Sequence, residues 1–245
     1  MMHAHAGSPQ MDHMVVKILN DVSHGARHAT YPANAVICEP EMPADDVYLI
    51  ETGEVRIYQV SDSSTDRLLD IVGKGQWFGS AALAGLERHF FRAVTMTPVT
   101  LWATPGKKVR DAMCEEPQAL IEVLRHIVLL LANTAREATQ MATDDCRHRL
   151  VHTLVKFSQS AAATNVENGV VLRITHEQLA QAVGAARETV SLALTELRQA
   201  KLLQTGRNRL TFNPKALEEF AQRQANLNPV DVAEGQTPMN EPTPK

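Results

Sequence analysis

The chain has few of the residues that define several common protein classes. Its three cysteines, Cys38, Cys114 and Cys146, are too few and too far apart for a disulfide framework, which indicates a reducing compartment. They also fall short of the thiolate set that a cysteine-ligated iron–sulfur cluster requires from one subunit. No apolar run reaches the roughly 18 residues of a membrane span, and the first ten residues lack the apolar stretch of a secretory signal. We therefore expect a cytoplasmic protein with no membrane contact.

Signatures of catalysis and of cofactor binding are also missing. The sequence contains no P-loop, no GxGxxG motif and no set resembling a Ser-His-Asp triad, so nothing supports an enzyme. His148 and His152 have a metal-compatible spacing on an expected helix, but no third ligand lies nearby in sequence. A pair of surface histidines is the better interpretation. We expect no catalytic residue, no metal and no cofactor.

Positive charge is scarce overall but unevenly distributed. The net charge is −4, which argues against a uniformly basic nucleic-acid-binding surface. Residues 171–223, however, contain eight Lys or Arg against five Asp or Glu, a net charge of +3, so the rest of the chain carries −7. A basic C-terminal module on an acidic body is typical of site-specific DNA binding.

Residues 175–197 predict two short helices that cross steeply. Thr175 and Gln178 have the spacing of a capping box, and Gly184 can adopt the left-handed conformation that ends a helix. Ala180 stands where two closely crossing helices leave no room for a larger side chain. This pattern predicts a helix-turn-helix, although an ordinary pair of amphipathic helices has the same periodicity. The expected core positions are Leu179, Ala182, Val183, Val190, Ala193, Leu194 and Leu197.

A β-hairpin is expected directly after the second of these helices. Leu202–Thr205 and Arg209–Phe212 flank the turn sequence Gly206-Arg207-Asn208. A hairpin in this place turns the motif into a winged helix-turn-helix. Arg207 and Arg209 are then placed to meet phosphates.

The start of the second helix resembles a known DNA-reading element. Residues 186–191, Ala-Arg-Glu-Thr-Val-Ser, are similar to the recognition helix of the cyclic-AMP receptor/fumarate-nitrate regulator (CRP/FNR) family of bacterial transcription factors. In cyclic-AMP receptors an Arg-Glu pair at the positions of Arg187 and Glu188 reads a G·C-containing half-site. The family's second arginine, one turn on, is replaced here by Leu192. The resemblance implies DNA contacts from Arg187, Glu188, Thr189, Ser191, Thr195, His176 and Arg207.

The N-terminal half predicts an all-β barrel or roll. From Ala29 to Thr104, short β-forming runs recur about every ten residues between turn residues. Residues 48–55 and 75–79 resemble the cyclic-nucleotide-binding β-roll of the same family. Two turns that usually carry glycine there read Ala33-Asn34 and Pro40-Glu41, and asparagine tolerates the left-handed conformation. The expected strands are Ala35–Cys38, Val47–Ile50, Glu54–Val60, Leu68–Val72 and Val94–Met96.

The nucleotide pocket that the resemblance implies is degenerate. In cyclic-AMP receptors a glutamate binds the ribose and an arginine binds the cyclic phosphate. In this chain Ser80 replaces the glutamate. Counting without gaps places Phe90 at the position of the arginine and Phe91 at the position after it. Arg88 and Arg92 lie nearby, and a loop shift of one or two residues would bring either one in. We expect cyclic AMP to bind weakly or not at all, and both phenylalanine rings to fill the pocket. The pocket positions are Ser80, Ala81, Phe90, Phe91, Arg92 and Thr134.

One long helix is expected from Pro117 to about Asp144. Its apolar or small residues follow alternating steps of four and three, which is a heptad seam. The seam predicts a parallel homodimer, and the alternative is a helix buried against its own domain. Because Leu129 and Leu130 lie off the seam and would pack on the roll, both arrangements are compatible. The seam consists of Leu120, Leu124, Ile127, Leu131, Thr134, Ala138 and Met141.

The remaining segments are shorter. Met11–Val22 predicts an amphipathic helix, and Thr143–Asp145 predicts a hinge before a helix over Cys146–Ser160. A polar loop is expected over Ser158–Gly169, and a last helix over Pro214–Gln224. The tail from Asn226 to Lys245 is rich in proline and poor in apolar residues, which predicts disorder.

These observations predict an α+β protein in five parts. The expected parts are a tail and short helix (1–28), a cyclic-nucleotide-binding-like β-roll (29–115), a dimerisation helix (116–144), a winged helix-turn-helix domain (145–225) and a disordered tail (226–245). We expect a homodimeric transcription regulator that binds a palindromic operator in double-stranded DNA without cyclic AMP. RNA polymerase is a further candidate partner. The alternatives are control by cyclic di-GMP or haem, and a signalling module that does not bind DNA.

Overall fold

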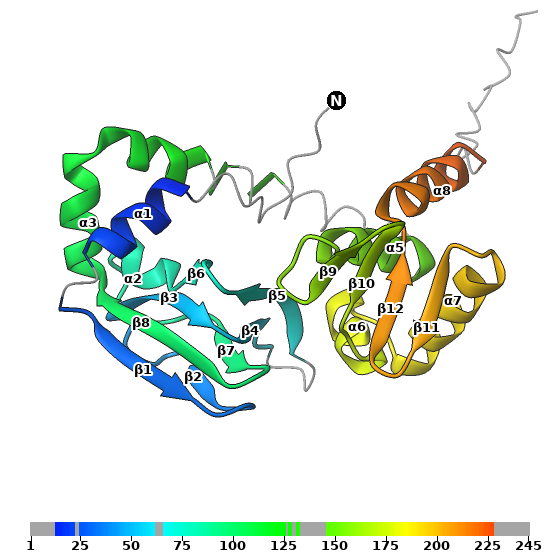
Figure 1. The fold of residues 1–245 in the computed structure, drawn as a ribbon, viewed down its shortest axis with the longest axis horizontal. Coiled ribbons are helices and arrows are strands. Elements are labelled where there is room, and N and C mark those ends of the chain that lie inside the picture. Colours follow the sequence, from blue (N-terminus) through cyan, green and yellow to red (C-terminus); the bar gives the residue numbers. More distant parts are fainter. Residues whose placement is uncertain are drawn as a thin grey trace, which may run out of the picture.

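The computed structural model describes residues 13–22, 25–61, 66–125, 127–128, 131–132 and 146–227. It has an N-terminal β-roll with helices on it and a C-terminal helical module with its own sheet, and the two lie side by side (Figure 1). The predicted α+β class is confirmed. The predicted N-terminal tail up to residue 12, the predicted continuation of the long helix after residue 132 and the predicted C-terminal tail after residue 227 lie outside the described residues. The predicted start of that tail at residue 226 was wrong, because residues 226 and 227 end the last helix.

The roll is built from two antiparallel sheets that enclose an apolar core. Alternate residues of each strand point inward, among them Ile50, Val55 and Leu101, which are almost fully buried. The strands expected from the sequence all form. The first sheet has the order β1 (Arg27–Tyr31), β8 (Val99–Pro105), β3 (Asp46–Thr52), β6 (Trp77–Phe78); the second has the order β2 (Val36–Cys38), β7 (Arg92–Thr95), β4 (Glu54–Gln59), β5 (Arg67–Gly73).

Two turns of the roll take the left-handed conformation without glycine. Asn34 has φ 61° and Glu41 has φ 67°. The expectation for Asn34 is confirmed, because its short polar side chain tolerates this region. Glu41 adopts the same region although it lacks that advantage. The main chain holds the second turn, where the Glu41 N–H donates to the carbonyl of His89 at 3.0 Å.

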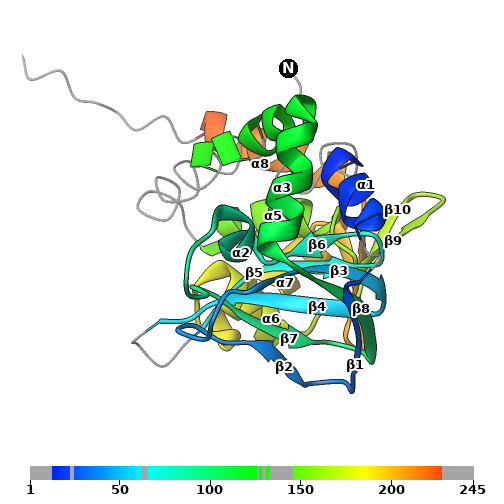
Figure 2. The ribbon, with the colours of Figure 1, turned by 90° about the vertical axis from the view of Figure 1, so that its left-hand side faces the viewer.

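Helices cover the outer side of the first sheet (Figure 2). α1 (His13–Asp21) and α3 (Gly106–Glu115) pack together through Val15, Leu19, Val109 and Met113. The helix expected over Met11–Val22 is therefore confirmed in its described part. Two helices were not predicted: the short α2 (Ser80–Ala84) and α3 itself. Residues 117–125, 127–128 and 131–132 continue as helix after α3.

The C-terminal module combines four helices with a four-stranded sheet. α5 (Cys146–Phe157) and α8 (Pro214–Leu227) pack together, next to α6 (His176–Val183) and α7 (Arg187–Gln199). The sheet has the order β11 (Leu203–Gly206), β12 (Arg209–Phe212), β10 (Gly169–Leu172), β9 (Ala163–Val166). The expected wing is confirmed as β11–β12. The expected loop over Ser158–Gly169 was wrong in part, because β9 lies inside it and pairs with β10.

The helix-turn-helix forms as the sequence predicts. The Thr175 hydroxyl accepts from the Gln178 N–H at 3.1 Å, and the Gln178 side-chain oxygen accepts from the Thr175 N–H at 2.8 Å, which is a complete capping box. Gly184 ends α6 with φ 68°, and its N–H donates to the Ala180 carbonyl at 2.9 Å. All of the expected core positions are buried: Leu179, Ala182, Val183, Val190, Ala193, Leu194 and Leu197.

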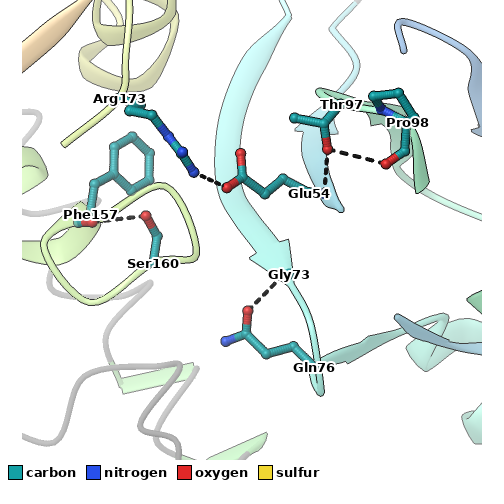
Figure 3. A network of polar contacts seen from close by, with 8 residues as sticks. All are labelled: Glu54, Gly73, Gln76, Thr97, Pro98, Phe157, Ser160 and Arg173. Carbon is teal, nitrogen blue, oxygen red and sulfur yellow. Dashed lines mark hydrogen bonds and ion pairs between the residues drawn. The ribbon is translucent and has the colours of Figure 1, made fainter. Parts of the chain in front are cut away.

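The roll and the C-terminal module share one apolar core. Tyr58, Leu68 and Ile71 from β4 and β5 belong to the same buried cluster as the inner faces of α6 and α7. Beside that cluster, the Ala161 N–H donates to the Ile71 carbonyl at 3.2 Å. Figure 3 shows Arg173 of the module forming an ion pair with Glu54 of β4. Main-chain, ionic and apolar contacts therefore all join the two parts.

A glycine allows this close approach. A Cβ on Gly73, the last residue of β5, would lie 2.4 Å from the Cβ of Ala161 in the module. We therefore expect Gly73→Ala to lower the free energy of unfolding by about 1–3 kcal/mol, the usual range for overpacking. Chemical denaturation of the full-length chain measures this change.

The matched control is the double variant Gly73→Ala/Ala161→Gly, which removes the clashing methyl group from the other side. It should recover most of the lost stability. A Gly73→Ala variant as stable as the wild type would show that the two parts separate readily at this point.

Candidate nucleic-acid interface and ligand pocket

One face of α7 is fixed in the core and the opposite face is open. Val190, Ala193, Leu194 and Leu197 are buried, which fixes the rotation of the helix about its axis. Arg187, Glu188 and Thr189 at its start are exposed. The N-cap residue Ala186 makes no side-chain capping bond, so no side chain at that position competes with a phosphate for the first N–H groups of the helix.

Three of the predicted DNA contacts are joined by hydrogen bonds. The ring Nδ1 of His176 lies 2.9 Å from the hydroxyl of Ser191, and the Thr195 hydroxyl donates to the Ser191 carbonyl at 2.9 Å. His176 is the first residue of α6, whereas Ser191 and Thr195 lie in the middle of α7. The His176–Ser191 bond therefore ties the start of one helix to the middle of the next and helps to set their crossing, whereas the Thr195–Ser191 bond lies within α7.

The wing presents two arginines. Arg207 lies at the exposed tip between β11 and β12, and Arg209 is exposed at the start of β12. The next residue after Arg207, Asn208, has φ 55°, which closes the tight turn. The hairpin thus carries positive charge on a main chain fixed by pairing with β10.

Two arginines of α5 support the motif and were missed from the sequence. Arg149 Nε donates to the Val183 carbonyl at the end of α6 at 3.3 Å. Arg147 forms an ion pair with Glu196 of α7 at 3.6 Å. The only sequence signal was the position of both arginines next to His148, which does not indicate which helices they contact. Their positions show that α5 braces both helices of the motif.

The predicted ligand pocket is only partly filled as expected. Phe91 is 4% exposed and belongs to the roll core, whereas Phe90 is 50% exposed. The expectation that both rings fill the pocket was therefore wrong for Phe90. Both residues precede β7, which begins at Arg92, and the Phe90 ring lies against the edge of the buried Phe91 ring, 5.5 Å between centres, with its other side exposed. Ala81 is buried, Ser80 is exposed at the start of α2, and Thr134 lies outside the described residues.

The two nearby arginines bind acidic residues of the chain itself. Arg92 forms ion pairs with Glu39, at 3.0 Å, and with Asp66. Arg88 donates to the Glu41 carbonyl at 2.7 Å and lies 3.7 Å from the Glu41 carboxylate. A phosphate ligand would have to compete with these partners for either guanidinium.

A buried histidine takes part in the aromatic cluster. His89 is 2% exposed, and its ring centre lies 5.3 Å from that of Phe91 and 6.4 Å from that of Tyr48. Neither of its ring nitrogens has a hydrogen-bond partner among the described residues. Burial lowers the pKa of His89 below its ordinary value of 6.5, and the opposing effect of the Asp45 charge is smaller. His89 is therefore neutral at pH 7.

Half of the exposed large apolar side chains among the described residues lie on the helix that follows α3. Leu120, Leu124, Ile127 and Leu131, the described part of the predicted seam, are all exposed, and Leu131 reaches 68%. Ile121 and Val128 widen this row. Ala119 is buried against α1 and α3, so the helix also packs on its own domain. Thr134, Ala138 and Met141 lie outside the described residues.

The lowered pKa of His89 predicts acid sensitivity of the roll. The unfolded chain gains a proton near pH 6.5 and the folded chain only at lower pH, so stability is full above pH 6.5 and falls as the pH drops through that value. We expect His89→Phe, which keeps the ring but cannot be charged, to lose less stability between pH 7 and pH 5 than the wild type does. Denaturation at both pH values measures the difference. An unchanged acid dependence in the variant would contradict this assignment.

Among the described residues, no helix has the length and apolar character needed to cross a bilayer. The described His, Cys, Asp and Glu residues form no group of three that could hold a metal ion.

Comparisons with known proteins match both halves of the fold. The family model of the cyclic nucleotide-binding domain matches residues 28–116, and that of the Crp-like helix-turn-helix domain matches residues 148–220. The transcriptional regulator SdrP of Thermus thermophilus is 31% identical over 79% of this chain and 93% of its own length. A global nitrogen regulator of Synechococcus elongatus is 29% identical over 74% of this chain and 83% of its own length.

A solved structure agrees with these relatives. A CRP/FNR-family transcriptional regulator from Thermus thermophilus matches with a TM-score of 0.64 and 30% identity, over 80% of this chain and 98% of that one. The relatives are transcriptional regulators and not enzymes. With its cyclic-nucleotide-binding-like roll and its DNA-binding helix-turn-helix, this chain belongs to the CRP/FNR family of bacterial transcriptional regulators.

Proposed function

We propose that this regulator binds a palindromic operator as a homodimer, through the N-terminal end of α7, in the cytoplasm of its cell. The observation that carries the proposal is the exposed start of α7, where Arg187 and Glu188 are free of the core while the later turns of the helix are anchored in it by Val190, Ala193, Leu194 and Leu197. Arg187 has the forked donors that guanine O6 and N7 accept, and Glu188 can accept from cytosine N4. His176, Thr189, Ser191, Thr195 and Arg207 complete the proposed contact surface.

A dimer follows from the geometry of operators. Two recognition helices must reach two half-sites about one helical turn apart, so the two subunits need a two-fold axis. The exposed row on the helix after α3 offers a self-complementary apolar surface. Large exposed apolar rows are rare on monomers, since water contact disfavours them. At a promoter, RNA polymerase is the further partner that such a dimer would meet.

The domain boundaries that we propose keep the five parts expected from the sequence. The roll and the winged module are the two units matched by family models, at 28–116 and 148–220. The helix between them carries the dimer seam.

We propose further that the protein binds DNA without a nucleotide. Phe91 and His89 occupy the roll interior, and Arg88 and Arg92 already have acidic partners. The start of α7 is exposed while the module is docked on the roll.

The alternative to ligand-free binding is control by a different ligand, such as cyclic di-GMP. One structural neighbour, the c-di-GMP-responsive regulator CLP of Xanthomonas campestris, shares the fold at 22% identity.

Arg187→Ala tests the proposed reading of bases. We expect specific affinity to fall by about 1–3 kcal/mol and the preference at one base pair of each half-site to relax, because a bidentate contact is lost. Operator selection followed by binding titrations measures both effects.

The control is Arg198→Ala, which removes an exposed arginine from the last turn of the same helix. It should leave the base preference unchanged. Equal weakening of Arg187→Ala on every sequence would instead make Arg187 a phosphate contact.

Ile127→Asp tests the proposed dimer. Two unpaired carboxylates in an apolar seam are costly to bury, so we expect monomers with little operator affinity. Sedimentation measures the oligomeric state. Arg125→Asp places the same carboxylate, with a charge change of −2 in place of −1, at an exposed position outside the seam and should remain dimeric. A dimeric Ile127→Asp variant would place the interface elsewhere.

A further inference from the structure

One large apolar side chain stands exposed on the recognition helix. Leu192 is 63% exposed, and no other large apolar residue of α7 is exposed. The exposed residues around it are polar or charged, and the apolar residues of the same helix are buried in the core. A single exposed leucine is common on protein surfaces, and what distinguishes Leu192 is its position on the helix.

Leu192 lies within the face that we propose for DNA. At about 100° per residue, it stands about 40° around the helix from Glu188 and about 60° from Thr195. The buried residues Val190 and Leu197 lie on the opposite side of α7. Leu192 is thus in the middle of the outer face and not at its edge.

Contacts within the described part of the chain leave Leu192 uncovered. The roll packs on α6 through β5, and α7 packs on α5, α6 and β11. The proposed dimer seam belongs to a different helix. An apolar partner of Leu192 would therefore have to bind to the outer face of α7.

We propose that Leu192 is a specificity-determining residue that contacts the 5-methyl group of a thymine. This inference rests on the proposed DNA-binding function. In the major groove, the thymine methyl is the apolar group that a base edge presents, and apolar side chains recognise it by contact. Leu192 lies about 6 Å along the helix from Glu188, which corresponds to about two base-pair steps. The contacted thymine should therefore lie within about two base pairs of the pair read by Glu188.

Uracil substitution tests this contact without changing the hydrogen bonds of the base. The operator is first selected with the full-length wild-type protein, and each thymine of the half-site is then replaced by uracil, which lacks only the methyl group. We expect one position per half-site at which uracil weakens wild-type binding about four-fold, the effect of one buried methyl group. Fluorescence titration with each DNA measures the loss.

Protein variants assign that loss to Leu192. Leu192→Ala should bind the thymine operator more weakly and show no difference between thymine and uracil at that position. Leu192→Met, which keeps an apolar side chain, should retain the difference. Leu86→Ala removes a similarly exposed leucine from the roll and should behave as the wild type does.

The outcomes separate this inference from the proposed function. If the wild type selects an operator but no uracil position weakens binding, the inference is wrong and the DNA-binding function stands. If Leu192→Ala remains as sensitive to uracil as the wild type, another residue contacts the methyl group. If the wild type selects no sequence at all, both the inference and the proposed function fail.

Discussion

The docking of the winged module on the strand β5 of the roll is the contact on which the rest of the structure depends. Leu68 and Ile71 join the apolar core that also holds α6 and α7 in place. Gly73 and Ala161 approach so closely that no side chain fits between them, and Glu54 pairs with Arg173 beside them. A displacement of β5 would therefore disturb the core that positions the helix-turn-helix. In our proposal, this contact makes the roll a part of the DNA-binding unit.

The interior of the roll is consistent with a fixed docking geometry. Phe91 and His89 are buried in the roll, and the acidic residues Glu39 and Glu41 form ion pairs with the neighbouring Arg92 and Arg88. Charged hydrogen bonds are worth more than neutral ones, so exchanging these partners for a phosphate gives little net gain. In our proposal, a roll that needs no ligand keeps β5, and with it α7, in one position.

Local signals in the sequence predicted the recognition module well. The capping box at Thr175, the helix end at Gly184 and the wing around Arg207 each depend on a few neighbouring residues, and all of them form. Features that depend on distant partners were harder to predict. β9 forms a strand because it pairs with β10. Arg147 and Arg149 of α5 can contact α7 and the end of α6 only because α5 packs against both helices. Phe90 is half exposed in the loop before β7, and gapless counting from a family motif cannot supply the conformation of that loop. The contacts of each residue with DNA remain predictions.

The central claim is that the folded chain holds its recognition helices ready without a ligand. The most direct measurement is the affinity of the purified, ligand-free protein for its selected operator, repeated with saturating cyclic AMP and with saturating cyclic di-GMP. The account predicts specific binding by the ligand-free protein and no response to either nucleotide. A gain of about ten-fold or more from either one, which corresponds to about 1.4 kcal/mol of coupling between the pocket and the DNA, would contradict it.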